Sequence, residues 1–171
     1  MTWTAPEVER PSGSLAAAEP DLLRGLLDWH RATTLHKCAG LNGEQLAERS
    51  VPPSEMSLLG LLRHLTDVER IWIRRRFAGE RVDFAYKTDA DWSADFHDTD
   101  AARAEEVYAG LIKEWEVCDA ITAGRELDET VTSGDVSYSL RFIYIHLIGE
   151  YARHNGHADL LRERVDGVTG A

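Results

Sequence analysis

The chain has 171 residues, of which 30 are acidic and 19 basic, so its formal net charge at pH 7 is −11. This surplus of negative charge argues against nucleic acid or an anionic membrane surface as the main partner. The chain contains no uninterrupted run of about 18 apolar residues and no basic, then apolar, leader, so we expect neither a membrane span nor secretion. Cys38 and Cys118 form no CxxC pattern, which argues against a disulfide framework and fits a reducing cytoplasm.

The length suits one buried core, and we expect a single domain over residues 1–171 with a flexible lead-in at 1–18. Apolar residues between positions 22 and 35 then predict a first helix within 20–41. The segment 43–56 reads as a short helical turn followed by a loop, because Pro52 and Pro53 cannot continue a helix. Residues 57–80 predict a second helix, with Ser57 as its N-cap and Gly79 at its end.

The stretch 80–99 has aromatic residues scattered among acids without a helical period, so it reads as a long surface loop. A third helix is predicted over 101–124, capped by Asp100, and a last and longest helix ends after Arg164, before Gly167. The segment 131–138 could form a brief extended stretch. The expected fold is therefore all-α, a four-helix bundle with antiparallel packing.

The last helix carries the sequence HLIGEYARHNGH at 146–157, which is unusually rich in candidate ligands. At about 100° per residue, Glu150 and His154 fall inside the apolar stripe of this helix, whereas His146 and His157 fall at its edge. A carboxylate in an apolar core costs several kcal/mol unless its charge is paired or it becomes protonated. Glu150 therefore needs a partner.

A metal ion is one such partner. Glu150 and His154 are four residues apart and adjacent on the helix face, and His64 on the inward side of the second helix offers a third ligand. Two histidines and one carboxylate leave coordination positions open, as catalytic sites do. Zinc suits these ligands best, but nickel, iron or manganese could occupy the same set.

The residue pattern is equally consistent with a second interpretation, in which no metal is bound. Glu150 could pair with an arginine and His154 could hydrogen-bond a carbonyl oxygen; the candidate arginines are Arg63, Arg141 and Arg153. Asp67 and Glu69 are expected to support the ligands or to form surface ion pairs. The residue pattern alone leaves the metal site and the arginine pair open.

Two motifs carry a resemblance: SLLGLLRHLTDVER around His64, and IGEYARHNGHADLLRERVDG around Glu150 and His154. Over residues 20–167 the chain resembles the DinB-like superfamily of metal-binding four-helix bundles. It is most similar to the actinobacterial branch related to mycothiol-dependent maleylpyruvate isomerase and mycothiol S-transferases, which has ExxxH where many members have HxxxH. The resemblance implies His64, Glu150 and His154 as metal ligands and an up-down-down-up connectivity. The isomerase has a further C-terminal domain that this sequence lacks, which favours the S-transferases.

The leading hypothesis is a metal-dependent thiol S-transferase that activates a low-molecular-weight thiol for attack on a small electrophile. Mycothiol is implied by the resemblance alone. We expect the electrophile to lie against the loop aromatics Phe84, Tyr86, Trp92 and Phe96. Residues that support the ligands or orient substrate are expected among His157, Arg153, His146 and Trp92. The alternatives are a non-catalytic metal-binding or sensor module and a metal-dependent hydrolase, and a homodimer is the expected assembly.

Overall fold

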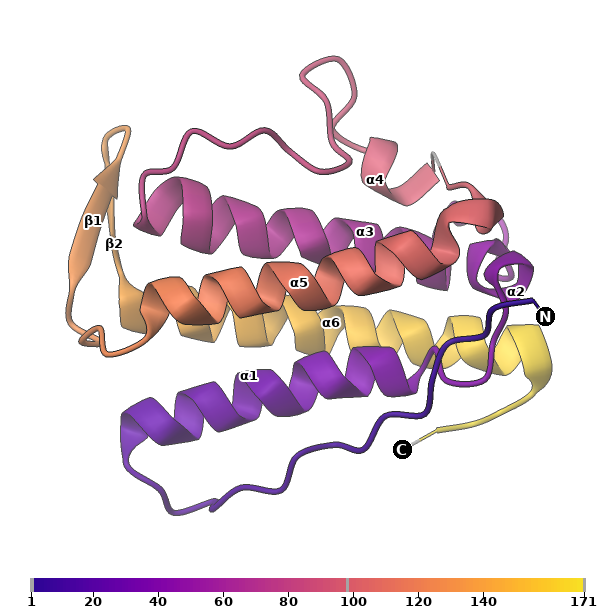
Figure 1. The fold of residues 1–171 in the computed structure, drawn as a ribbon, viewed down its shortest axis with the longest axis horizontal. Coiled ribbons are helices and arrows are strands. Elements are labelled where there is room, and N and C mark those ends of the chain that lie inside the picture. Colours follow the sequence, from indigo (N-terminus) through magenta and orange to yellow (C-terminus); the bar gives the residue numbers. More distant parts are fainter. Residues whose placement is uncertain (1, 98, 171) are drawn as a thin grey trace.

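The computed structural model describes residues 2–97 and 99–170, so residues 1, 98 and 171 of the predicted lead-in, loop and C-terminus lie outside it. The fold is mostly helical, with one small two-stranded sheet (Figure 1). The long helices are α1 (Glu19–His36), α3 (Leu58–Glu69) continued by η1 (Arg70–Phe77), α5 (Ala104–Thr122) and α6 (Leu140–Asp166). The short elements are α2 (Gly43–Ala47), α4 (Ala94–His97), η2 (Ala101–Arg103), β1 (Thr130–Ser133) and β2 (Val136–Ser139). No helix of the described residues is long and apolar enough to cross a membrane.

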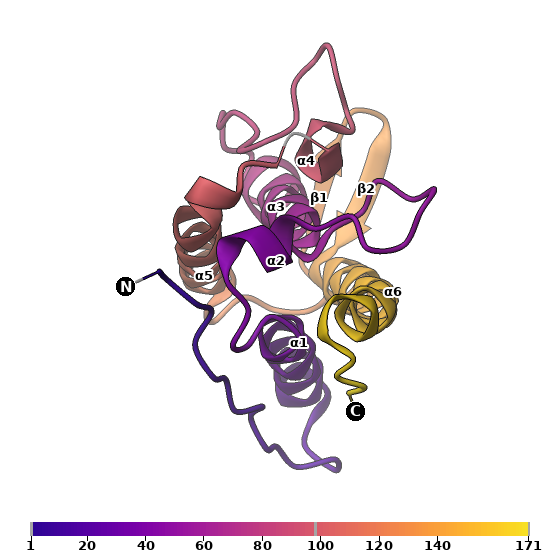
Figure 2. The same cartoon turned by 90° about the vertical axis from the view of Figure 1, so that its right-hand side faces the viewer.

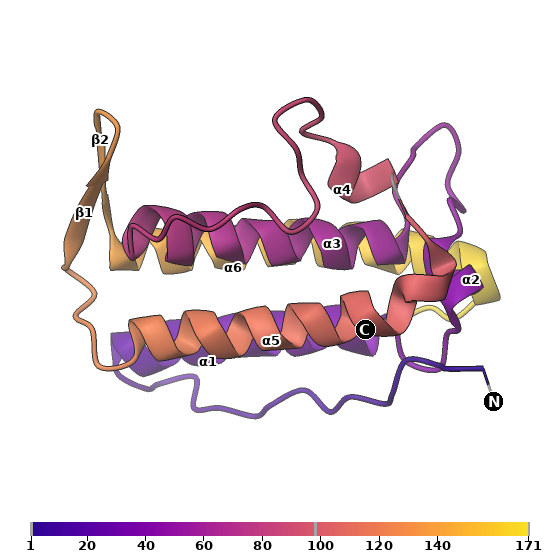
Figure 3. The ribbon, with the colours of Figure 1, turned by 45° about the horizontal axis from the view of Figure 1, so that its top comes forward.

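The long helices lie side by side along one axis (Figures 1 and 3). Helices α1 and α6 run from the end with the β hairpin toward the end with α2, whereas α3 and α5 run in the opposite direction (Figure 1). Figure 2, viewed along the helices, shows α1 beside α6 and α3 beside α5, and these pairs are in contact. Both pairs are therefore parallel, and the antiparallel packing predicted for them is wrong. Parallel packing of α3 and α5 is possible because residues 78–97 and 99–103 lead back along the molecule (Figure 1).

The helix ends lie where the predicted capping residues place them. The Ser57 hydroxyl accepts a hydrogen bond from the Gly60 N–H at the start of α3, and the Asp100 carboxylate accepts one from the Ala102 N–H at the start of η2. Gly167 ends α6 with a φ of 79°, a left-handed conformation that glycine adopts without strain. Local sequence chemistry therefore sets these boundaries.

Three local elements add detail to the predicted helices and loops. Residues 131–138, predicted as a brief extended stretch, form an antiparallel hairpin in which Val131 pairs with Tyr138. The loop 80–99 contains the four-residue helix α4, which is too short for a helical period to reveal. The predicted helix 57–80 changes at Arg70 into a π-helix, η1, in which Ile73 and Phe77 remain buried. A prediction based on apolar period could not detect that change, because the buried face is retained.

The core is formed mainly by the apolar faces of α3, α5 and α6, as predicted. The buried residues of these faces include Leu58, Leu61, Leu62, Leu65, Val68, Ala104, Val107, Leu111, Cys118, Thr122, Ile143, Leu147, Ala158 and Leu161. On α1 the prediction is only partly right, because Leu27 and Leu35 are buried but Leu22 and Leu26 are 36% and 42% exposed. Arg31 of α1 is buried instead.

Arg31 is buried because its side chain forms an ion pair with Glu69 of α3 in the interior of the protein. Its guanidinium donates two hydrogen bonds to the Glu69 carboxylate, at 2.8 and 2.9 Å. The Tyr151 hydroxyl donates a third, at 3.0 Å, and itself accepts one from the Trp115 indole at 2.6 Å. The expectation that Glu69 supports the metal ligands or forms a surface ion pair is therefore wrong. Its charge is fully buried and is balanced by a two-pronged arginine contact.

The N-terminal segment, predicted to be flexible, is fixed at Ala5. This residue is buried, its N–H donates to the Leu41 carbonyl, and its carbonyl accepts from the Gly40 N–H. The ring of Trp3 also packs edge-on against Tyr108, with 5.7 Å between ring centroids. The first part of the lead-in therefore packs against the end of α1 and against α5.

Candidate metal centre

His64 of α3 and the pair Glu150 and His154 of α6 meet between the two helices. One ligand atom from each side chain lies within 4.8 Å of the other two. The Glu150 Oε2 is 3.9 Å from the His64 Nε2 and 3.5 Å from the His154 Nε2. Imidazole and carboxylate ligands bind zinc at about 2.0–2.2 Å, so small side-chain movements would bring all three atoms onto one ion. The cluster could therefore hold a metal ion.

The buried Nε2 of His64 also fits a cation. It has no hydrogen-bond partner among the described residues, and the 3.9 Å to Glu150 is too long for a hydrogen bond. A buried polar atom without a partner is costly and needs an explanation. A divalent cation between Nε2 and the carboxylate would satisfy both groups.

The arginine pairing that the sequence left open for Glu150 does not occur among the described residues. Its ion-pair partners there are the histidines His64, His146 and His154. Arg141 instead pairs with Glu19 at 2.9 Å, and Arg63 donates to the Ala94 carbonyl oxygen at 2.9 Å. Nitrogen atoms that can bind a metal therefore surround this carboxylate.

The surroundings of His154 and Glu150 set protonation states suited to metal binding. Burial and the neighbouring His64 lower the pKa of His154 to about 4, so this imidazole is neutral at pH 7. The His64 imidazole lowers the pKa of Glu150, which stays ionised. Burial lowers the pKa of His64, but the Asp95 and Glu150 carboxylates outweigh it and raise that pKa overall. A neutral imidazole and an ionised carboxylate are the ligand forms that bind metals.

Asp95 of α4, which the sequence analysis missed, orients His64. Its Oδ2 is 2.8 Å from the His64 Nδ1, its side chain is fully buried, and Lys87 pairs with the same oxygen. Burial raises the pKa of Asp95, but hydrogen bonds from His64 and Lys87 lower it more, so the group is ionised. An ionised carboxylate only accepts hydrogen bonds, so Nδ1 carries the proton and Nε2 is left for a metal.

A close approach of α4 to α3 brings Asp95 to this place. Gly60 lies one turn before His64, and a Cβ atom there would stand 2.6 Å from the Phe96 carbonyl oxygen. The Phe96 ring stacks on the His64 ring, with 4.4 Å between centroids. Glycine is therefore required in the motif SLLGLLRH, because it lets the loop reach the histidine.

Asp67 fixes the loop from one turn further along α3. Its carboxylate accepts hydrogen bonds from three consecutive backbone N–H groups, those of Ala85, Tyr86 and Lys87, at 2.6, 2.9 and 2.8 Å. It is fully buried, so the expected role as a surface ion pair is wrong. Asp67 supports the candidate ligands indirectly, through the loop that carries Lys87 and Asp95.

We expect Asp67→Ala to lower the free energy of unfolding by about 1–3 kcal/mol, because three N–H groups lose their acceptor. Amide hydrogen exchange should also quicken at residues 85–87, while exchange within α5 stays slow. The matched control is Asp83→Ala, which removes an exposed carboxylate from the same loop and should leave both quantities nearly unchanged. Unaltered exchange at 85–87 in Asp67→Ala would show that the carboxylate does not hold the loop.

We expect Asp95→Ala to weaken metal binding by about 10–100-fold, the usual effect of removing the group that orients a histidine ligand. Competition with a chelator of known affinity measures this. Asp95→Asn keeps an acceptor oxygen for Nδ1 and should lose less, and Asp89→Ala, an exposed loop carboxylate, should bind metal like the unaltered protein. If folded Asp95→Ala bound metal as tightly as the unaltered protein, Asp95 would not orient His64 for metal binding.

Two further histidines predicted near the site do lie beside it. The His146 Nε2 is 3.5 Å from the Glu150 Oε1, whereas His64 is paired with the other carboxylate oxygen, Oε2. The His157 Nδ1 is 3.2 Å from the His154 Nδ1, so it contacts the ring nitrogen opposite the one that faces Glu150. Both can orient the groups they touch.

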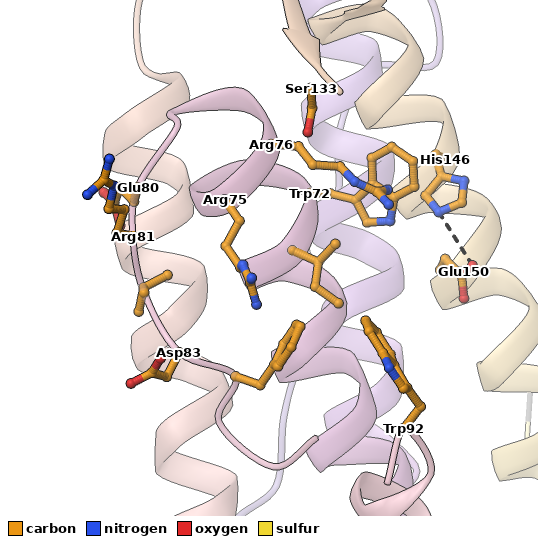
Figure 4. Close-up of a pocket in the computed structure, with 13 residues that line it drawn as sticks. Trp72, Arg75, Arg76, Glu80, Arg81, Asp83, Trp92, Ser133, His146 and Glu150 are labelled. Carbon is orange, nitrogen blue, oxygen red and sulfur yellow. Dashed lines mark ion pairs between the residues drawn. The ribbon is translucent and has the colours of Figure 1, made fainter. Parts of the chain in front are cut away.

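A cavity of about 780 Å³ opens beside Glu150 and His146 (Figure 4). Its walls come from η1, the start of the long loop, and α6. Of the four loop aromatics expected to lie against the electrophile, Phe84 and Trp92 line this cavity, whereas Tyr86 and Phe96 pack against α3. Arg153, also expected near substrate, is exposed on α6 and is not among the residues that line the cavity.

Neither cysteine of the chain can serve as the thiol. Cys38 and Cys118 are buried and unpaired. Burial raises the pKa of Cys38 to about 12 and that of Cys118 still further. A thiolate is the reactive form of a thiol, so a reacting thiol at this site has to come from outside the chain.

Comparison with known families extends this picture. The family described as Mycothiol-S-transferase matches residues 22–167, a range that includes every residue of the candidate metal centre and of the cavity. No curated protein and no solved structure matches the chain. The matched range covers most of the 171 residues, and the chain therefore belongs to the mycothiol S-transferase family, a DinB-like actinobacterial family.

Proposed function

We propose that this protein is a metal-dependent thiol S-transferase that joins mycothiol to a small electrophile. The observation that carries the proposal is the cluster of His64, Glu150 and His154, in which Glu150 also lines a cavity, in a chain of the mycothiol S-transferase family. Two imidazoles and one carboxylate leave positions at which a thiol could bind. A bound divalent ion would favour the thiolate over the thiol.

The side chains around the cavity have separate parts in this proposal. His64, Glu150 and His154 would hold a divalent ion, which would bind the thiol sulfur, and Asp95 keeps the His64 ring in place. Burial lowers the pKa of His146, so this imidazole is neutral and can accept the thiol proton. The new bond joins sulfur to carbon, and the leaving group departs with the electron pair of its bond to that carbon.

Zinc is the metal we propose, because nitrogen and oxygen ligands and an open position suit it. Nickel, iron or manganese would fit the same side chains, since the preference of such ligands overlaps among these metals. Element analysis of the purified protein identifies the ion.

We infer further that the four long helices form a DinB-like four-helix bundle with up-down-down-up connectivity. The opposite directions of the pairs α1 with α6 and α3 with α5 support this (Figure 1). Whether two such chains form a homodimer stays a prediction, which sedimentation would test.

The test of the proposed function is a reaction with and without thiol. The purified protein is given mycothiol and 1-chloro-2,4-dinitrobenzene, an electrophile whose chloride a thiolate displaces. We expect formation of the thioether, with loss of chloride, to be faster than the uncatalysed rate and to require both thiol and metal. Turnover to the phenol without thiol would indicate a hydrolase instead. Metal binding without turnover of any of several electrophiles would indicate a sensor or binding module.

A further inference from the structure

Two arginines of η1, Arg75 and Arg76, line the cavity beside Glu150 (Figure 4). Neither forms an ion pair with a carboxylate in the part of the chain that the structure describes. The other two arginines of η1 are different, since Arg70 and Arg74 each pair with a glutamate at 2.7 Å. Unpaired arginines are unexpected in a chain of net charge −11, where carboxylates are abundant.

Aromatic rings hold both guanidinium groups. The Cζ atom of Arg75 lies 4.1 Å from the centroid of the Phe84 ring, and that of Arg76 lies 4.0 Å from the centroid of the Trp72 ring. A guanidinium stacked on a ring keeps the N–H donors along its edge available for hydrogen bonds. Each arginine is thereby oriented while its donors remain free for a ligand.

The acidic side chains that line the cavity are engaged elsewhere or directed away. Glu80 pairs with Arg74, and Glu150 faces the histidines. Figure 4 shows the Asp83 carboxylate directed away from Arg75. None of the described acidic side chains of the cavity therefore pairs with Arg75 or Arg76.

Beside these arginines the wall carries an apolar surface, formed by the side chains of Ile71, Trp72, Val82, Phe84 and Trp92. We propose that this cavity selects an electrophile that has an apolar body and a carboxylate group, an inference that rests on the proposed thiol transfer. The carboxylate would accept paired hydrogen bonds from Arg75 and Arg76. The apolar body would lie between the aromatic rings, with the reactive carbon toward Glu150 and the candidate metal centre.

An electrophile with a carboxylate group needs the positive charges of Arg75 and Arg76 in order to bind. A protein of net charge −11 repels anions at long range, so an anionic substrate needs a local positive site to bind. The carboxylate takes no part in the chemistry. Sulfur forms its bond to the reactive carbon, the leaving group takes the bonding electrons, and the thiol proton passes to the protein or solvent.

The test measures binding without turnover. Calorimetry compares two unreactive probes of the same shape, 4-methylbenzoate and 4-methylbenzamide, on the purified metal-loaded protein. We expect the carboxylate to bind at least about tenfold more tightly than the amide, as hydrogen bonds to charged partners are the stronger ones. In the double variant Arg75→Gln, Arg76→Gln this preference should vanish, with the Kd of the amide unchanged within about twofold.

Two controls separate this site from its surroundings. Arg103→Gln removes one positive charge from an exposed arginine of η2 that does not line the cavity, and it should keep the full preference. Chelator-treated protein should also keep it, because the arginines and not the metal hold the carboxylate.

Equal binding of the two probes to the unaltered protein would overturn the inference. So would a preference that survives the double variant or disappears with the metal, since the carboxylate would then be bound elsewhere. These outcomes are distinct from failure of the proposed function, which is absence of thiol-dependent turnover with neutral and anionic electrophiles alike.

Discussion

Replacement of His154 by alanine is expected to release the metal ion and to lower the rate of thiol transfer by about 100–10,000-fold. The rate loss corresponds to the several kcal/mol that a metal ion contributes to such reactions. His154 is the most buried of the three candidate ligands and its imidazole is neutral near pH 7, so alanine removes a ligand that is already in its metal-binding form. Element analysis and the rate of thioether formation measure the two effects.

His36→Ala is the matched control, because His36 lies on α1 and its ring contacts the Val8 carbonyl oxygen at 3.2 Å, away from the cluster. This variant should keep both metal and activity. Glu150→Gln and His64→Ala should behave like His154→Ala if the three act as one site. A folded His154→Ala protein that retains its metal and its rate would contradict the assignment of the ligands.

The second large effect is on stability. Glu69→Leu should lower the free energy of unfolding by about 3–5 kcal/mol, because it leaves the buried Arg31 guanidinium without its main partner. Arg31 is only 3% exposed, and the Glu69 carboxylate also accepts a hydrogen bond from the Tyr151 hydroxyl. Denaturant unfolding followed by circular dichroism measures the change.

The double variant Arg31→Met, Glu69→Leu removes both charges together and should recover much of the lost stability. The control Glu105→Gln alters an exposed glutamate of α5 and should change the free energy of unfolding by less than about 0.5 kcal/mol. A loss no larger for Glu69→Leu than for this control would show that the buried ion pair does not stabilise the fold.

Regular helices could be predicted well from the sequence, because their information is local. The apolar period of residues 58–68 defines a buried face, and Ser57, Asp100 and Gly167 mark helix ends through bonds to their own neighbours. The buried face of helix α1 is harder to predict from the sequence. Its buried Arg31 is stabilised by Glu69, which lies 38 residues away, and no local pattern signals a partner at that distance.

In the candidate site, too, local contacts can be predicted from the sequence and long-range contacts cannot. The spacing of Glu150 and His154 on one helix face predicts their proximity, and the apolar surroundings of His64 predict that it points inward toward them. Asp95 could not be found in this way, since its contact with His64 depends on how the loop 80–99 folds back onto α3. That path depends on Gly60 and on three backbone hydrogen bonds to Asp67, whose roles no residue period reveals.

Anomalous X-ray scattering from crystals of the protein, purified without chelator, tests the central claim most directly. The account predicts one peak between α3 and α6, within about 2.0–2.2 Å of the His64 Nε2, a Glu150 carboxylate oxygen and the His154 Nε2. It also predicts that this peak is absent from His154→Ala crystals. A peak at any other place, or none in crystals of the unaltered protein grown with added zinc, would contradict it.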